Sequence, residues 1–156
     1  MSCDVAVAAF LMFTSAQSAS PAITPAVAAA MQPVSQEPLF RDIVQRAAGL
    51  KSQVDTWRAG VGVAAAPAPL SGFDAFSARI SELSALDQQG HELLKARGSD
   101  GDLKCILHGI SQDLPLKLIA VKDAKTGHDQ DLALRDMAYL LNDNVEVITA
   151  PPAPPV

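Results

Sequence analysis

The sequence predicts an all-α protein, an antiparallel four-helix bundle preceded by a Pro/Ala-rich arm and followed by a Pro-rich tail. Apolar residues recur at the spacing of one helical face in four segments, each about 20 residues long. The connections between these segments are short, which is typical of antiparallel neighbours in a bundle. A chain of 156 residues suits one domain, which we place at residues 35–148.

The first helix is predicted to begin near Ser35, a favourable N-cap residue, with Pro38 close to its first turn. Its apolar stripe alternates spacings of three and four residues, as in a heptad pattern. The stripe consists of Phe40, Ile43, Ala47, Leu50, Val54 and Trp57. Gly60 and Gly62 end the pattern. Because Trp57 closes the stripe, we expect its ring to anchor the core rather than to bind a ligand.

The second helix is predicted over residues 71–97, with Ser71 as its N-cap and Gly98 as its stop. Its stripe begins with Phe73, Phe76, Ile80 and Leu83. The same three- and four-residue spacing then calls for apolar residues at two further positions that the sequence fills otherwise.

Asp87 and Gly90 occupy those two positions. One interpretation is a polar spot in the core, close to His91. The other is a slight rotation of the helix, after which leucines take over the stripe. These leucines are Leu86, Leu93 and Leu94. We favour the rotation, because burying a lone carboxylate costs free energy, and Gly90 then permits a close helix crossing.

The third and fourth helices are predicted over residues 102–124 and 129–148. The third stripe comprises Leu103, Ile106, Leu107, Ile110, Leu114, Leu118 and Val121. The fourth comprises Leu134, Met137, Leu141, Val145 and Ile148. Pro115 interrupts the third helix, since it lacks an N–H group and crowds the carbonyl of Ser111. We expect either a kink there or a break in which Asp113 caps a second half.

Residues 1–18 are predicted to be a signal peptide for export. An apolar run from Val5 to Phe13 is too short to span a membrane, and a small-residue cleavage triplet at residues 16–18 follows it. The segment before the run contains Asp4 and no Lys or Arg, so two alternatives stay open: an uncleaved apolar arm, or a different start site. Export places the mature chain in the periplasm or outside the cell.

The composition of the two terminal segments and the net charge of the chain indicate further properties, including which classes of partner are disfavoured. Residues 19–34 read as a flexible Pro/Ala-rich linker, and residues 149–156, with four prolines, as a disordered, solvated tail. The net charge is −5 and basic residues do not cluster, which argues against nucleic acid as a partner. We expect no membrane span in the mature chain.

Cys105 and His108 are the first candidate site. They lie three residues apart on one helical face, roughly half a turn from the main apolar stripe. A thiolate and an imidazole are two of the ligands that a soft metal ion accepts, and they can equally form an activated thiol. The simpler interpretation, which we favour, is a partly buried cysteine beside a surface histidine.

The sequence contains no enzyme signature: it lacks a Gly-rich phosphate loop, a G-x-S-x-G motif and an H-E-x-x-H motif. We therefore expect no catalytic residue and no cofactor. The prediction is a non-catalytic binding or scaffold module for an unknown protein or small-molecule partner. The alternative is a metal- or redox-responsive bundle that uses Cys105 and His108. Loss of Cys3 with the signal leaves one thiol, which predicts a disulfide-linked dimer through Cys105.

Overall fold

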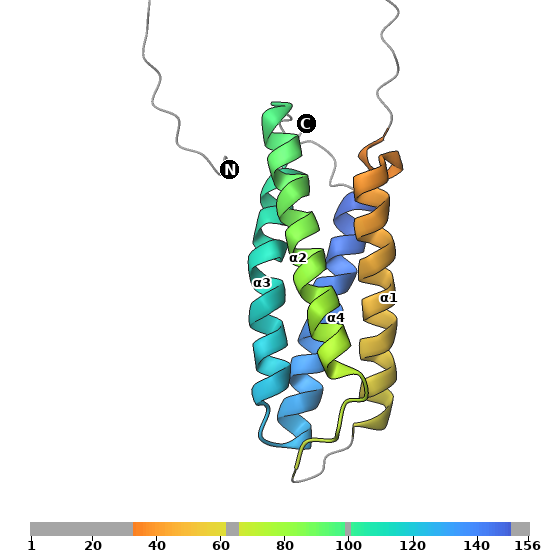
Figure 1. The fold of residues 1–156 in the computed structure, drawn as a ribbon, viewed down its shortest axis with the longest axis vertical. Coiled ribbons are helices and arrows are strands. Elements are labelled where there is room, and N and C mark those ends of the chain that lie inside the picture. The colour runs from red at the N-terminus through yellow and green to blue at the C-terminus, as the bar shows by residue number, and fades with distance from the viewer. Residues whose placement is uncertain (1–32, 62–65, 99–100, 151–156) are drawn as a thin grey trace, which may run out of the picture.

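The computed structural model of the protein describes residues 33–61, 66–98 and 101–150. These residues form a short 3-10 turn and four α-helices (Figure 1). The turn is η1 (Val34–Gln36), and the helices are α1 (Pro38–Gly60), α2 (Phe73–Ala96), α3 (Leu103–Asp123) and α4 (Gly127–Thr149). This part of the chain contains no strand, and the predicted all-α four-helix bundle is confirmed.

Several sequence predictions concern residues outside the described ranges. The predicted signal peptide at residues 1–18 lies outside them, as do most of the predicted linker and most of the predicted tail. The last two linker residues are described, and Val34 begins η1. Among the described residues, no helix combines the length and the apolar character that crossing a bilayer requires.

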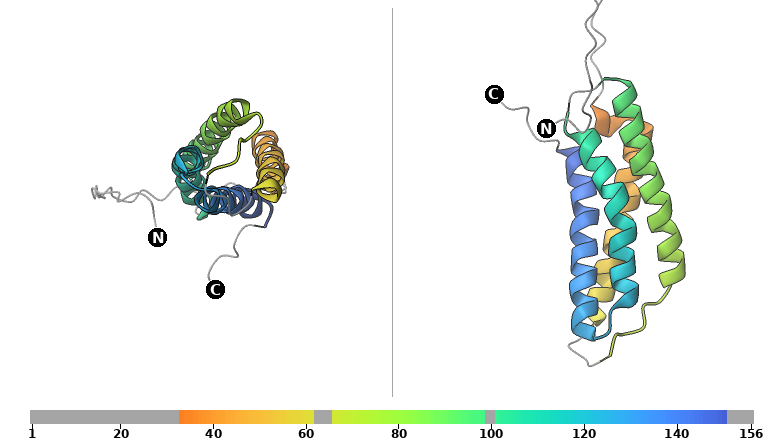
Figure 2. Two further views of the ribbon diagram at one scale, coloured as in Figure 1. Left: turned by 90° about the horizontal axis from the view of Figure 1, so that it is seen from below. Right: turned by 90° about the vertical axis from the view of Figure 1, so that its left-hand side faces the viewer.

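Successive helices run in opposite directions, as contacts between their ends show (Figure 1). Arg97, just after α2, donates two hydrogen bonds of 2.8 Å to Glu37, just before α1. Arg58, late in α1, pairs with Asp131, early in α4, at 3.1 Å. Each helix packs against its neighbours in chain order and α1 also packs against α4, so α2 and α4 face each other across the diagonal (Figure 2).

The α1 stripe is buried along its whole length, as predicted. At its end, the rings of Trp57 and Phe76 lie edge to face with their centroids 4.8 Å apart. The indole Nε1 of Trp57 donates a hydrogen bond of 3.2 Å to the backbone carbonyl of Ser71. Trp57 is only 9% exposed, so its ring lies in the core as predicted.

The start of α2 differs from the prediction. Gly72 rather than Ser71 precedes the helix, and no side chain caps its first turn. Gly72 has a φ of +74°, a conformation that residues with a Cβ atom adopt only with strain. Ser71 contributes its carbonyl to Trp57 instead of its hydroxyl to the helix. In α4, by contrast, the hydroxyl of Thr126 accepts a hydrogen bond of 3.0 Å from the N–H of Asp129.

The helix α3 continues through Pro115, so the predicted break with a cap at Asp113 is wrong. Proline has no N–H, which leaves the carbonyl of Ser111 without its helical donor. The hydroxyl of Ser84 on α2 donates a hydrogen bond of 2.7 Å to this carbonyl. A side chain from the neighbouring helix thus replaces the missing bond, which explains how a continuous helix tolerates the proline.

Candidate functional site

A network of polar side chains, partly buried, lies where α2 meets α3. We call this group the α2/α3 polar seam; it comprises Ser84, Gln88, His91, His108, Ser111 and Gln112. Ser84 and Gln88 lie one turn apart on α2, and Ser111 accompanies His108 one turn away on α3. The hydroxyl of Ser111 donates to the carbonyl of His108 at 2.6 Å and also lies 3.3 Å from Oε1 of Gln88.

The two histidines of the seam stack on each other. Their ring centroids are 4.7 Å apart and the rings are inclined by 30°. Nδ1 of His91 lies 2.7 Å from the carbonyl oxygen of Lys104. A carbonyl oxygen can only accept, so Nδ1 of His91 carries the proton and donates.

The second ring is held in the same way. Nδ1 of His108 donates to Oε1 of Gln88 at 2.9 Å, because an amide oxygen also only accepts. Nε2 of His108 lies 3.2 Å from Nε2 of Gln112, and the amide donates to it. On the opposite edges of the rings, Nε2 of His91 lies 3.9 Å from Oε1 of Glu92, and Nε2 of His108 faces the amide of Gln112.

The structure brings His108 of α3 beside His91 of α2. Cys105 is half-buried in the first turn of α3, and its N–H donates to the carbonyl of Asp102 at 2.9 Å. Within the described ranges, no group of three or more His, Cys, Asp or Glu side chains is placed to hold a metal ion. The Cys105–His108 metal hypothesis gains no further ligand there and stays a prediction.

The state of the Cys105 sulfur also bears on the predicted dimer. In the part of the chain that the structure describes, no cysteine is free. A disulfide between two chains through Cys105 requires a free thiol, so the structure lends that prediction no support.

The pairing of His91 with His108 is a contact that the sequence analysis missed. A usable signal was present, because residues at equal distances from the turn of a helical hairpin lie at the same level. Each histidine is seven residues from a glycine of the turn, His91 from Gly98 and His108 from Gly101. The periodicity of each helix, read alone, does not contain this information.

Asp87 and Gly90 face the core, so the predicted rotation of α2 is wrong. Asp87 is 0% exposed, whereas Leu86 and Leu93, two of the leucines expected to replace it, are only half-buried. A Cβ atom on Gly90 would lie 3.2 Å from side chains of both α1 and α3. The close crossing at Gly90 is therefore confirmed, and the core does contain a polar spot.

Asp87 bonds across the diagonal of the bundle to Asn144 on α4. Nδ2 of Asn144 donates a hydrogen bond of 2.8 Å to Oδ2 of Asp87, and both residues are 0% exposed. Burial raises the pKa of Asp87 from 3.8 to about 7, and the bond from Asn144 opposes part of that rise. At neutral pH the neutral and the ionised carboxyl are therefore both accessible to the folded protein.

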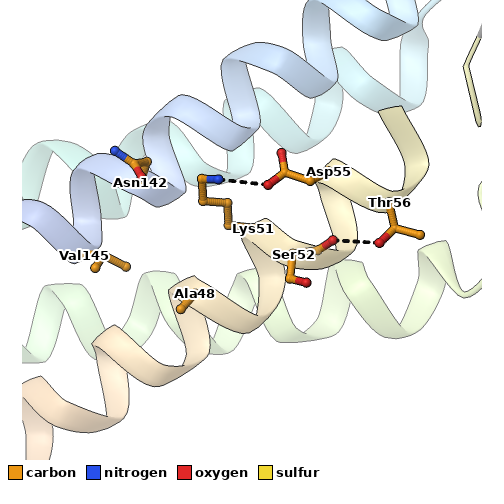
Figure 3. Close-up of a pocket in the computed structure, with 7 residues that line it drawn as sticks. All are labelled: Ala48, Lys51, Ser52, Asp55, Thr56, Asn142 and Val145. Carbon is orange, nitrogen blue, oxygen red and sulfur yellow. Dashed lines mark hydrogen bonds and ion pairs between the residues drawn. The ribbon is translucent and has the colours of Figure 1, made fainter. Parts of the chain in front are cut away.

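Two of the surface hollows among the described residues differ clearly in character, and the first is lined mainly by polar residues. It has a volume of about 510 Å³ and lies between α1 and α4 (Figure 3). Lys51 and Asp55 point toward each other along its edge and form an ion pair of 2.8 Å. They neutralise each other within one helix, so this hollow presents no unbalanced charge to a ligand.

The second hollow is an apolar cavity of about 320 Å³ at the end of the bundle that η1 covers; we call it the end cavity. The residues that line it are Pro33, Val34, Ser35, Leu94, Gly101, Leu103, Lys104, Ile148 and Thr149. They come from η1, the end of α2, the start of α3 and the end of α4. Apolar side chains dominate the lining, which is typical of small-molecule sites and of pockets for a partner's apolar side chain.

Comparison with known proteins does not assign a function to these sites. Comparisons with protein-family models, with curated protein sequences and with solved structures found no match to this chain. The features of this chain that bear on function are the end cavity, the polar seam and the buried Asp87–Asn144 pair.

Proposed function

We propose that the protein is a non-catalytic binding module and that the end cavity is its contact site. The observation that carries this proposal is the lining of the cavity, which collects apolar side chains from four separate elements at one end of the bundle. A volume of about 320 Å³ lies at the lower end of the range of ligand pockets. The ligand class is a small apolar molecule or an apolar side chain of a partner protein.

The polar groups of the interior support a binding role over a catalytic one. Catalysis by a histidine needs a proton acceptor within reach of a substrate. His91 is only 6% exposed, and His108 has both ring nitrogens in hydrogen bonds to Gln88 and Gln112. The bonds of His91 to Lys104 and of His108 to Gln88 join α2 to α3, and the bond to Gln112 covers the other nitrogen of His108 within α3.

A fluorescence titration with the apolar dye N-phenyl-1-naphthylamine tests the end cavity. The full chain should bind the dye saturably, and Leu103→Glu should weaken binding by about tenfold or more because it places a charge in an apolar lining. Leu116→Glu is the matched control, since Leu116 is on the same helix but 61% exposed. Equal dye affinity in both variants would place the binding site elsewhere.

Export of the protein remains part of this proposal. It is supported by the apolar run from Val5 to Phe13 and the small residues at positions 16–18 that follow it. Mass spectrometry of the protein from the cell envelope or the medium should find a new N-terminus at Ala19. An intact N-terminus on protein recovered from the cytoplasm would contradict the proposal.

A metal-responsive bundle is the second candidate function, and the histidine stack favours it. In both rings Nδ1 donates to an oxygen atom, as in most metal-bound histidines, and binding through Nε2 of His108 requires the Gln112 amide to move away. Titration of the full chain with Zn²⁺ or Cu²⁺ tests this candidate, with His108→Ala and Cys105→Ser as variants. Binding lost in His108→Ala alone would assign the site to the stacked rings, and binding lost in both would restore the Cys105–His108 pair.

A further inference from the structure

The Asp87–Asn144 pair is the most deeply buried polar contact among the described residues. Both side chains are 0% exposed, and the backbones of their helices are not neighbours, because α2 and α4 lie across the diagonal. The bond of 2.8 Å therefore passes through the middle of the bundle. Neither residue takes part in the end cavity or in the histidine stack.

This pair forms one hydrogen bond and leaves one buried oxygen atom on each side chain without a donor. Nδ2 of Asn144 donates to Oδ2 of Asp87, while Oδ1 of Asp87 and Oδ1 of Asn144 are both buried and have no hydrogen-bond donor. An ionised carboxylate and an amide oxygen can only accept hydrogen bonds. When Asp87 is ionised, Oδ1 of Asp87 and Oδ1 of Asn144 therefore both remain without a donor. A proton on Oδ1 of Asp87 turns one of these two acceptors into a donor.

The surroundings offer no positive charge to balance an ionised Asp87. The described buried residues include no lysine and no arginine, and His91 is the only other titratable side chain among them. His91 lies one turn further along α2, stacks on His108 and donates its Nδ1 proton to the carbonyl of Lys104.

The other three helices contribute no charged side chain to the core around Asp87. Their buried residues there are apolar on α1, apolar apart from a serine on α3, and apolar apart from Asn144 itself on α4. Around Gly90, one turn along α2 from Asp87, the neighbouring side chains are those of Leu107, Phe40 and Ile43, all of them apolar. A negative charge on Asp87 would therefore be neither paired nor solvated.

We propose that Asp87 and Asn144 form a buried proton-binding site that locks α2 to α4. In the protonated form, Oδ1 of Asp87 donates to Oδ1 of Asn144 while Nδ2 of Asn144 donates to Oδ2 of Asp87, so the acid and the amide close a ring of two hydrogen bonds. Loss of the proton to solvent breaks the O–H···O bond, leaves both Oδ1 atoms without a partner and places an unpaired charge in the core. The ligand of this site is a single proton, and its release weakens the diagonal contact.

The direction of the pH effect follows from the two pKa values. The pKa of Asp87 is about 7 in the folded chain, against 3.8 for an unperturbed aspartate. Both states are protonated at pH below 3.8, so the stabilisation is complete there. As pH rises from 3.8 to 7 the unfolded chain loses its proton and the folded chain keeps it, so stability falls, and above pH 7 it levels off. The unfolding equilibrium constant should increase by about a thousandfold across this window.

The first test measures the protonation of Asp87 directly in the wild-type full chain. The ¹³C chemical shift of its carboxyl carbon, followed by NMR between pH 4 and pH 9, should show a midpoint close to 7. The infrared spectrum at pH 5.5 should contain the band of a neutral carboxylic acid, and Asp87→Asn should remove it. A carboxyl that is already ionised at pH 5.5 in the folded protein would overturn the proposal.

The second test compares stability across pH by urea titration of the full chain. Asp87→Asn replaces the acid with a neutral group of the same shape that can still donate to Asn144, so it should abolish most of the thousandfold change. The matched control is Asp143→Asn, which removes an exposed carboxylate from the residue beside Asn144 and should leave the change intact. An unchanged pH dependence in Asp87→Asn, or its loss in Asp143→Asn, would refute the proton lock.

Discussion

The two ends of α2 contribute to the core in opposite ways. Near its start, Phe73 and Phe76 pack with Trp57 of α1 in an aromatic group whose ring centroids lie 4.8 to 6.5 Å apart. Further along, the same face of α2 carries Asp87, and the polar seam with α3 follows. The start of the helix is held by apolar contact, whereas its second half adds buried hydrogen bonds to apolar contacts such as that of Leu94.

The two regions of α2 are expected to act differently, one on the stability of the bundle and the other on the register in which its helices align. Burial of apolar surface is non-directional, so an aromatic cluster stabilises many similar arrangements of two helices. A buried hydrogen bond has a narrow range of distance and angle, so it favours one register over its neighbours. We expect the aromatic end to contribute most of the free energy, and the polar end to select how the four helices align.

The largest expected effect is at the aromatic end. Trp57→Ala should lower the free energy of unfolding by about 3–5 kcal/mol, because it removes a buried ring and leaves a cavity. Tyr139→Ala is the control, since Tyr139 is 64% exposed and its loss should cost less than about 1 kcal/mol. Urea titration measures both. Similar costs for the two variants would mean that Trp57 is not an anchor.

At the polar end, the expected effect is smaller and depends on one hydroxyl. Ser84→Ala removes the donor to the carbonyl of Ser111, which Pro115 has already deprived of its helical partner. We expect a loss of about 1–3 kcal/mol in the free energy of unfolding, because a buried acceptor is left unsatisfied.

The control for this change lies one turn earlier on α2. Ser81 is exposed and donates only to the carbonyl of Ser77 on its own helix at 3.1 Å. Ser81→Ala should stay within about 0.5 kcal/mol of the wild type. If Ser84→Ala is equally mild in the urea titration, another group satisfies the Ser111 carbonyl.

The close helix crossing at Gly90 predicts that Gly→Ala changes stability in opposite directions at two positions, Gly90 and Gly49. A Cβ atom at Gly90 would lie 3.2 Å from both Leu107 and Phe40, so Gly90→Ala should destabilise the bundle by about 1 kcal/mol despite its better helix propensity. Gly49 has no atom within 4 Å of its Cβ position, so Gly49→Ala should stabilise by up to about 1 kcal/mol. Thermal unfolding of both variants checks the pair, and stabilisation in each would show that the crossing is loose.

The smallest effect is expected at the exposed rim, where Arg97 lowers the pKa of Glu37 by hydrogen bonding. Because the folded pKa lies below the ordinary 4.5, this contribution is present above pH 4.5 and is lost as pH falls through the folded value. Glu37→Gln should remove that small acid dependence, and added salt should mask it, since the pair is exposed. Urea midpoints at pH 3 and pH 6, at low and high salt, provide the measurement.

The sequence predicted most of the fold because helix periodicity is a local property. The stripes of α1 and α4 came out at the core, and each helix began and ended within a few residues of its predicted limits. The predicted N-cap of α2 was wrong because Ser71 and Gly72 both suit that position. Only the contact of the Ser71 carbonyl with Trp57 distinguishes them. The sequence also did not reveal that α3 continues through Pro115. The hydroxyl that replaces the missing hydrogen bond to Ser111 belongs to Ser84 on another helix.

The sequence by itself determined that this chain forms four amphipathic helices joined by short connections, since the spacing of apolar residues along each segment specifies which face is buried. Only the tertiary structure decided that Asp87 meets Asn144, that His91 stacks on His108 and that apolar residues from four elements enclose the end cavity. The reason is physical: the cost of burying a polar group depends on the partner it finds. Those partners come from other helices, more than 50 residues away in the case of Asn144, so their chemistry is set by packing and not by local pattern.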